Sequence, residues 1–300
     1  MTTPAPLATA PALALAAAIA APLVWSIGGV VMRSVATAGP WEQVFWRAVG
    51  GGIAVAIALA LSRPRAAWTA WRQAGATGWV SAVCIAGTFI VHVLAINATT
   101  VANVLFLQTA NPLLVPILAR LFLGERLEPR MIGALALAVA GLTPIVAASA
   151  GGGRLGGDLL ALACAGLGAV NILVVRRGRT VDMTPAIVVA ALLTLAVAGI
   201  VASPSDVAAR DVAALVLLGV VQIAVGLWLF LFALRRLPAA PVALLTLLEP
   251  IIGPLLVWLV VAEVPPAATL AGGAVVLVAL ALCALVAARP AARMPSGTPT

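Results

Sequence analysis

The chain has 300 residues, of which 64% are hydrophobic and only 9% are charged, and its formal net charge is +8. Since roughly a quarter of the residues of a soluble globular domain are charged, this composition excludes a soluble protein and indicates an integral membrane protein. The basic residues are all Arg and lie in short clusters between apolar runs, which argues against nucleic-acid binding.

The apolar runs are long enough to cross a bilayer as helices, which takes about 20 residues each. Turn residues or charges separate them, for example Gly39-Pro40, Arg63-Pro64-Arg65 and Pro265-Pro266. Strands of a membrane barrel would be about half as long and would alternate apolar and polar residues, so the runs predict helices. In chain order, we expect ten transmembrane helices at residues 11–32, 41–61, 76–97, 100–122, 130–147, 156–175, 185–202, 212–234, 239–261 and 266–287.

The Arg residues between these helices are unevenly divided between the two sides of the membrane. Cytoplasmic loops carry the excess of positive charge, so we expect both termini to be cytoplasmic, as an even number of spans requires. Abundant Ala and the absence of Lys indicate a GC-rich bacterial genome, so the expected location is a bacterial inner membrane. This orientation leaves outside only Arg33, Arg154 and Arg210, and it places inside Arg63, Arg65, Arg72, Arg126, Arg130, Arg176, Arg177, Arg179, Arg235, Arg236, Arg289 and Arg293.

Residues 94–127 match residues 232–265 without gaps, at an offset of 138 residues. Both stretches contain Pro, three residues, Pro, eight residues and Glu, and Pro is costly inside helices. Each stretch belongs to a unit of five spans, and this odd number places the second unit upside down in the membrane. We therefore expect an all-α integral membrane protein with two inverted five-helix repeats, residues 1–150 and 151–290, and a disordered cytoplasmic tail at 291–300.

Glu249 is the one acidic residue in the middle of a predicted span, and Asn111 is its counterpart in the first repeat. A charge there costs roughly 2.5–3.5 kcal/mol and usually faces protein or a water-filled cavity. Each residue directly precedes a Pro, which removes a backbone hydrogen bond and kinks the helix. Such broken helices bind substrates in membrane transporters, although a purely structural role for the kinks, with Glu249 protonated, stays open. The predicted hinges are Pro112, Pro116, Pro250 and Pro254.

Further motifs accompany this frame: Phe45-Trp46-Arg47, Asn111-Pro112, Leu123 to Leu127, Ile132 to Gly141, Leu248-Glu249-Pro250, Glu263 and Leu270 to Gly273. Their order and spacing over nearly the whole chain resemble the drug/metabolite transporter superfamily, specifically its ten-helix EamA-type exporters. Within that group the chain looks most like the YddG-type exporters of aromatic and other amino acids. The resemblance implies a secondary transporter that exports small metabolites, neutral and aromatic amino acids foremost. One departure is visible, since the second repeat has Leu192 where the first has Arg47.

The polar and aromatic residues within the spans predict a central cavity between helices one, three, four, six, eight and nine, used for alternating access. There Glu249 and free carbonyls would accept hydrogen bonds from an ammonium group, while amide side chains would donate to a carboxylate. Packing or interhelical bonding is the alternative for each residue. Arg47 is expected to pair with Glu42, with a contact to an anion as the alternative, and the lack of a cation at mid-span argues against strongly anionic substrates. The candidate lining is Trp25, His92, Gln108, Asn111, Asn171, Gln222, Trp228 and Glu249.

Several motifs of enzymes and pumps are missing from the sequence. It has no Gly-rich phosphate loop, no HExxH and no GxSxG, so we expect no enzyme, no cofactor and no metal. The alternatives are a multidrug, organic-cation or nucleoside carrier of the same fold and, in another class, a membrane enzyme acting on lipid. The expected partners are a small-molecule substrate and the lipid bilayer, without nucleic acid, for a chain that acts as a monomer.

Overall fold

The computed structural model describes residues 9–62, 64–124, 129–177, 183–237 and 239–287, so the predicted tail at 291–300 lies outside the described residues. Within these ranges the chain is helical, has no strands and forms ten segments long and apolar enough to cross a membrane. This confirms the predicted all-α fold and its ten spans. The first five spans are α1 (Thr9–Ser34), α2 (Pro40–Ser62), α3 (Pro64–Ala98), α4 (Val101–Gln108) with α5 (Ala110–Leu123), and α6 (Pro129–Gly151). The other five are α7 (Leu155–Arg177), α8 (Thr184–Val201), α9 (Ala209–Gly219) with η2 (Val220–Gly226) and α10 (Leu227–Leu234), α11 (Ala239–Thr246) with α12 (Glu249–Val261), and α13 (Ala267–Ala287).

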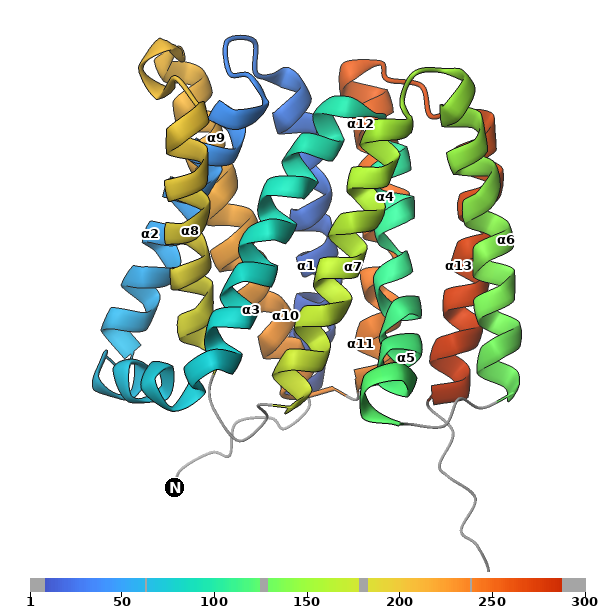
Figure 1. Cartoon of the computed structure of the whole chain (residues 1–300), viewed down its shortest axis with the longest axis horizontal. Helices are drawn as coiled ribbons and strands as arrows, with labels where there is room; N and C mark the ends of the chain where they lie inside the picture. The colour runs from blue at the N-terminus through green and yellow to red at the C-terminus, as the bar shows by residue number, and fades with distance from the viewer. Residues whose placement is uncertain (1–8, 63, 125–128, 178–182, 238, 288–300) are drawn as a thin grey trace, which may run out of the picture.

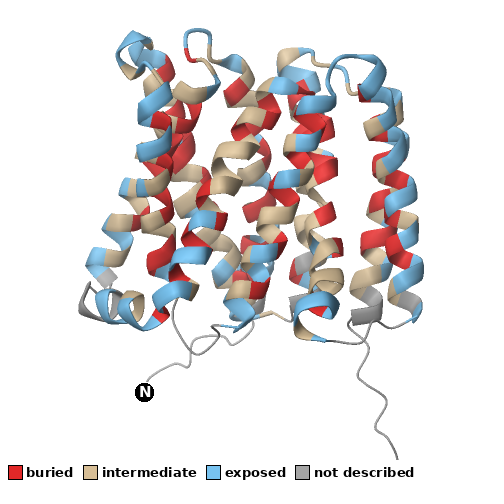
Figure 2. Ribbon diagram, in the orientation of Figure 1, coloured by how far each residue is buried: buried red, intermediate tan, exposed pale blue. Residues whose placement is uncertain are grey.

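The spans stand side by side in one bundle, and α1 begins at the same end of the bundle at which α13 ends (Figure 1). Helices of the first half pack mainly on helices of the second half: α3 on α7 and α8, α6 on α13, α1 on α12, and α2 on α8 and α9. Exposed residues are frequent on the outside of the bundle, and buried residues lie toward its interior (Figure 2). The interior is therefore formed jointly by the two halves.

The fourth and ninth spans are each broken into two helices at matching positions. Thr109 separates α4 from α5, and Leu247 and Leu248 separate α11 from α12. The end of the half-helix before the break and the end of the whole span recur 138 residues later, the latter with a left-handed C-cap at Gly124 (φ 68°) and at Ala262 (φ 57°). The sequence match is thus a match of backbone conformation, because the Pro after each break removes the hydrogen bond that would continue the helix.

Helix α3 is longer than the predicted third span and is interrupted at Gly75. Its 35 residues would extend about 52 Å at 1.5 Å per residue, whereas the hydrocarbon core of a bilayer is about 30 Å thick. Gly75 has φ 50° and ψ −132°, outside the helical region, and the preceding turns run across the end of the bundle (Figure 1). The prediction placed a loop before residue 76, but this short segment is helical and carries Trp68, which is 65% exposed.

The bundle is densely packed near the end away from the start of α1. One core cluster there contains Met32, Val93, Ile96, Val101 and Val257, all almost fully buried. These residues come from α1, α3, α4 and α12, so this layer closes the interior at that end. For clarity, we call this the packed end of the bundle.

A buried polar cluster at the packed end is centred on Asp158 near the start of α7. The Asp158 carboxylate accepts hydrogen bonds from the Thr99 hydroxyl (2.7 Å) and the Asn103 amide (3.0 Å). The Asn103 amide also donates to the hydroxyl of Ser149 on α6 and accepts from the hydroxyl of Thr269 on α13. The cluster therefore joins α4, α6, α7 and α13, and its buried polar groups satisfy one another.

Candidate functional site

A cavity of about 370 Å³ lies in the interior of the bundle. Its walls come from α1, α2, α3, α4, α7, α8, η2, α10 and α12. The second and seventh spans (α2 and α8) therefore join the six spans that the sequence predicted. The size suits a small metabolite, because ligand pockets have volumes of about 300–1,000 Å³. The lining residues are Trp25, Arg47, Ile85, Thr88, Phe89, His92, Gln108, Cys164, Ile187, Gln222, Ile223, Leu227 and Glu249.

A second chamber of about 250 Å³ adjoins the first. The two share four lining residues, Thr88, Gln108, Cys164 and Glu249. The second chamber reaches the breaks of both interrupted spans, because Thr109, Asn111, Thr246 and Leu247 contribute to its wall. The kinked helices thus border the chambers, with Pro112 and Pro250 in the same wall.

Glu249 lies where the two chambers meet. It is the first residue of α12, directly after the break, and directly before Pro250. Among the described residues its carboxyl group has no hydrogen-bond or ion-pair partner. A carboxyl group in this position is available to a cationic or hydrogen-bonding group of a bound molecule.

His92 on α3 and Gln108 at the end of α4 form a pair in the wall of the first chamber. His92 Nδ1 lies 2.9 Å from Gln108 Nε2 and 3.2 Å from Gln108 Oε1. The ring therefore accepts from the amide or donates to it, depending on its tautomer. Both side chains had been predicted to lie in the cavity, and their pairing fixes the orientation of the imidazole.

Arg47 on α2 also lines the first chamber, and here one expectation from the sequence is wrong. Its Nη2 donates to Gln222 Oε1 at 2.8 Å and its Nη1 lies 3.4 Å from the sulfur of Met32, so it does not pair with Glu42. The Glu42 carboxylate instead accepts from the backbone N–H of Ser203 (2.8 Å). A cationic side chain therefore does reach the cavity, which leaves a contact of Arg47 with an anion as the remaining interpretation.

Gln222 lies in the π-helical segment η2 and bonds to both α1 and α2. Its side-chain Nε2 donates to the Trp25 backbone carbonyl (2.7 Å), and the backbone carbonyl of Gln222 accepts from Trp25 Nε1 (3.0 Å). Glycines make this close approach possible: a Cβ at Gly28 would lie 2.2 Å from Gln222 Nε2, and one at Gly226 would lie 2.3 Å from Trp25 Nε1. Each helix thus accommodates a side chain of the other over a glycine.

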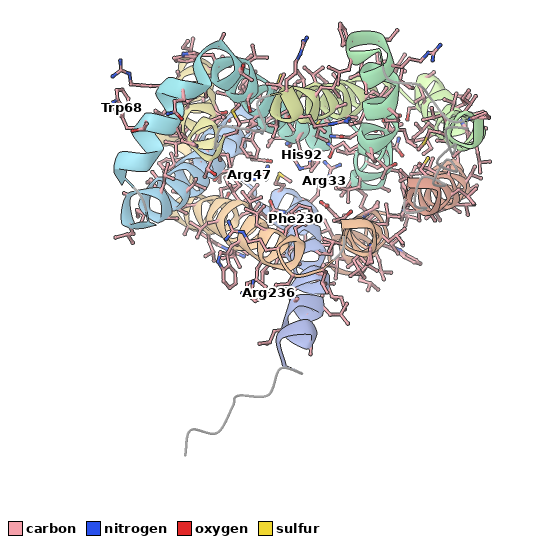
Figure 3. All side chains as sticks on the ribbon, turned by 90° about the horizontal axis from the view of Figure 1, so that it is seen from below. Arg33, Arg47, Trp68, His92, Phe230 and Arg236 are labelled. Carbon is pink, nitrogen blue, oxygen red and sulfur yellow. The ribbon has the colours of Figure 1, made fainter. Side chains whose placement is uncertain are left out.

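Viewed from the end at which α1 begins, Arg47 and His92 lie around the middle of the ring of helices, whereas Trp68 and Arg236 lie at its rim (Figure 3). The side chains of Arg47, His92, Trp25, Gln222 and Glu249 all border the same chamber. The chamber therefore combines a cation, an acidic group, amides and aromatic faces.

Two predicted lining residues lie elsewhere. Trp228 is 61% exposed on the outside of the bundle, where its ring lies 5.5 Å from that of Phe232. The physical reason is the wide turn of η2. Its i→i+5 hydrogen-bond pattern places Leu227 above Gln222 on the cavity side. Trp228, the next residue, is rotated by about 100° around the helix axis and so points away from the cavity. Asn171 accepts a hydrogen bond from Ser81 (2.7 Å), which joins α7 to α3, and borders neither chamber.

The remaining predicted residues lie near the breaks. Asn111 borders the second chamber with its amide against Gly168, where a Cβ would lie 2.1 Å from Asn111 Nδ2. Pro116 and Pro254 lie inside α5 and α12, one turn beyond Pro112 and Pro250. The sequence did not predict that Thr88 and Cys164 line the chambers. The pattern of apolar runs gives no signal for them, because both residue types are common in packed helices.

Residues 12–147 and 155–285 each match the model of the EamA-like transporter family. The chain belongs to this family. It is therefore a multi-pass membrane protein and a transporter of small solutes, built from the family's two repeats. A solved crystal structure, described only as that of a protein, is similar over 92% of this chain and 99% of its own, with a TM-score of 0.63 and 24% identity, which supports the fold. No curated protein matches the chain significantly.

Proposed function

We propose that this EamA-family transporter exports neutral amino acids, aromatic ones included, from the cytoplasm across a bacterial inner membrane. The observation that carries the proposal is the unpartnered carboxyl group of Glu249 in a cavity with otherwise mainly apolar and aromatic walls. The carboxyl group would accept hydrogen bonds from the ammonium group of an amino acid. The apolar surfaces of Ile85, Phe89 and Ile187 would contact its side chain, and they would tolerate side chains of several sizes.

Alternating access would use the two broken spans. In this structure the packed end is closed by buried residues of α1, α3, α4 and α12. Opening it requires these helices to separate, and the breaks beside Pro112 and Pro250 are places at which half-helices can tilt without losing further hydrogen bonds. The proposed cycle moves the two repeats against each other around a fixed cavity.

The proposed orientation places both termini in the cytoplasm and the packed end on the outside. The Arg asymmetry supports it: Arg33, Arg154 and Arg210 belong to the packed end, and Arg176, Arg177, Arg235 and Arg236 to the other. Single cysteines at Ser205, which is exposed at the packed end, and at Thr180, which lies outside the described residues, test it in a background without native cysteines. An impermeant reagent added outside the cells should label the first and spare the second. The reverse pattern would contradict the orientation.

Counterflow in proteoliposomes tests the substrate class. Purified protein is reconstituted with an excess of an unlabelled neutral amino acid, and uptake of the labelled compound is compared with that of nucleosides and organic cations. We expect uptake of amino acids, and a decrease of at least tenfold in Glu249→Gln, because a neutral amide binds an ammonium group much more weakly than a carboxylate does. Glu42→Gln, a change of the same chemistry at the packed end, is the matched control and should transport normally.

The same assay distinguishes the proposed function from its two alternatives, a carrier of the same fold with another substrate and a membrane enzyme. Uptake of organic cations or nucleosides without amino acids would replace the proposed substrate. Covalent turnover of a lipid by the reconstituted protein would instead indicate a membrane enzyme. Normal amino-acid transport by Glu249→Gln would leave the substrate class intact and would contradict the role of Glu249.

A further inference from the structure

Arg47 is a buried cation without a carboxylate partner in the part of the chain that the structure describes. Its side chain is 7% exposed, its Nε has no hydrogen-bond partner, and the ion pair found among the described residues joins Arg33 to Glu263. Removing a charge from water is expensive unless it is paired. Here the guanidinium borders the cavity, so the missing partner is expected from a molecule bound there.

Gln222 holds the guanidinium in place without neutralising it. Nη2 donates to Gln222 Oε1 and Nη1 lies against the Met32 sulfur, whereas Nε has no protein acceptor, so the planar donor set is only partly used. The Gln222 side chain is itself held by the hydrogen bond from its Nε2 to the Trp25 backbone carbonyl, and it lies over Gly28. A guanidinium fixed in this way is oriented before a ligand arrives, which lowers the entropic cost of binding.

We propose that Arg47 binds the carboxylate of the substrate in the first chamber, that Gln222 is its positioning residue, and that the substrate is recognised as a zwitterion. The proposal deepens the proposed function and rests on it for the ammonium partner, Glu249. Carboxylates match the donor geometry of guanidinium groups. Because Arg47 and Glu249 border one chamber, a ligand with one positive and one negative group completes both sites.

The charge balance favours a carboxylate over a phosphate. Among the described lining residues, Arg47 is the one Arg, and the cavity contains no second cation to balance a phosphate dianion. The carboxyl group of Glu249, which borders the same cavity, would add repulsion. A monovalent carboxylate attached to an ammonium group leaves no net charge in the cavity.

The test compares binding of a neutral amino acid with binding of its amide, which keeps the ammonium group and lacks the carboxylate. In the full-length purified protein we expect the acid to bind at least tenfold tighter, the scale of one charge-assisted hydrogen bond. This ratio should fall to about threefold or less in Arg47→Lys, which loses the planar donor set, and in Gln222→Leu. Glu249→Gln should weaken both compounds and preserve the ratio. Gln43→Leu, which removes a buried glutamine outside the cavity, is the control and should leave the ratio unchanged.

A second measurement does not depend on amino-acid recognition. The thermal stability of the detergent-purified protein is followed with isobutyrate, isobutyramide or inorganic phosphate at equal concentration. We expect isobutyrate alone to raise Tm, and Arg47→Gln to abolish the effect. An unchanged acid-to-amide ratio in Arg47→Lys and Gln222→Leu, or equal effects of isobutyrate and isobutyramide, would overturn the carboxylate site. Stabilisation by isobutyrate in a protein that binds no amino acid would contradict the proposed substrate and preserve the anion site, whereas stabilisation by phosphate alone would overturn the choice of carboxylate.

Discussion

Arg33 at the end of α1 and Glu263 just beyond α12 form an ion pair at the packed end, with 2.8 Å between Arg33 Nε and Glu263 Oε2. Glu263 also accepts from the backbone N–H of Val101 (2.7 Å), and Arg33 donates to the Thr99 carbonyl (2.6 Å). The pair therefore connects the ends of α1 and α12 to the start of α4. These are helices whose inner faces close the cavity at that end.

Breaking this pair should favour opening of the packed end. Glu263→Gln removes the charge. Because a partly exposed ion pair contributes about 1 kcal/mol or less, we expect the labelling rate of a buried reporter cysteine at this end to rise about two- to fivefold. The measurement is the labelling rate of a cysteine at Val257, which is fully buried in the packed layer, by an impermeant reagent added at that side. Glu42→Gln, at the same end, is the control. Equal labelling rates with and without Glu263→Gln would show that the pair does not hold this end closed.

Gly28→Ala should weaken substrate binding although Gly28 does not border the cavity. Its new Cβ would lie 2.2 Å from Gln222 Nε2, so Gln222 must move and Arg47 loses its acceptor. We expect amino-acid affinity to fall about tenfold, the scale of one hydrogen bond to a charged group. Gly133→Ala, where the new Cβ would meet nothing within 4 Å, is the matched control. The positioning role would be refuted by equal affinities for the two variants in ligand titrations.

Replacement of Pro250 by Ala should slow transport without destabilising the fold. The substitution restores a backbone donor beside the break between α11 and α12, which favours a continuous helix. We expect the transport rate to fall several-fold while Tm holds or rises, measured on the same preparation. Pro144→Ala changes a Pro inside α6, away from the chambers, and should transport normally. Unchanged transport in both Pro112→Ala and Pro250→Ala would reduce the breaks to packing features.

Ala262→Gly should stabilise the protein. Ala262 is the one residue other than Gly with positive φ among those described, and it occupies the left-handed C-cap that Gly124 provides in the first repeat. Relief of left-handed strain contributes about 1 kcal/mol, partly offset by the greater chain entropy of unfolded Gly. Thermal unfolding should shift upward for Ala262→Gly and downward for Gly124→Ala. A lower Tm for Ala262→Gly would contradict the assigned strain.

The ten spans, the repeat and the two broken helices could be predicted from the sequence because each leaves a local signal: a long apolar run, a fixed offset or a Pro. The position of Arg47 could not, since its contact with Gln222 depends on how α2 and η2 meet in space. Trp228 was misplaced for a related reason: regular helical periodicity gives no indication of the π-helical turn that sets which face points inward. The structure places Glu249, His92 and Gln108 in the chamber wall, where polar side chains of long apolar spans are expected because they are costly unless they face protein or water; their contact with substrate stays a prediction.

The reactivity of Cys164 provides the most direct test that the central cavity holds the substrate. Cys164 borders both chambers, and Cys84→Ala with Cys283→Ala leaves it as the only cysteine of the chain. The measurement is the rate of its reaction with a small methanethiosulfonate, with and without a transported neutral amino acid. The account predicts that the amino acid slows the reaction several-fold in this background and has no effect when Arg47→Lys and Glu249→Gln are added. A rate that no transported amino acid changes would place the substrate outside this cavity.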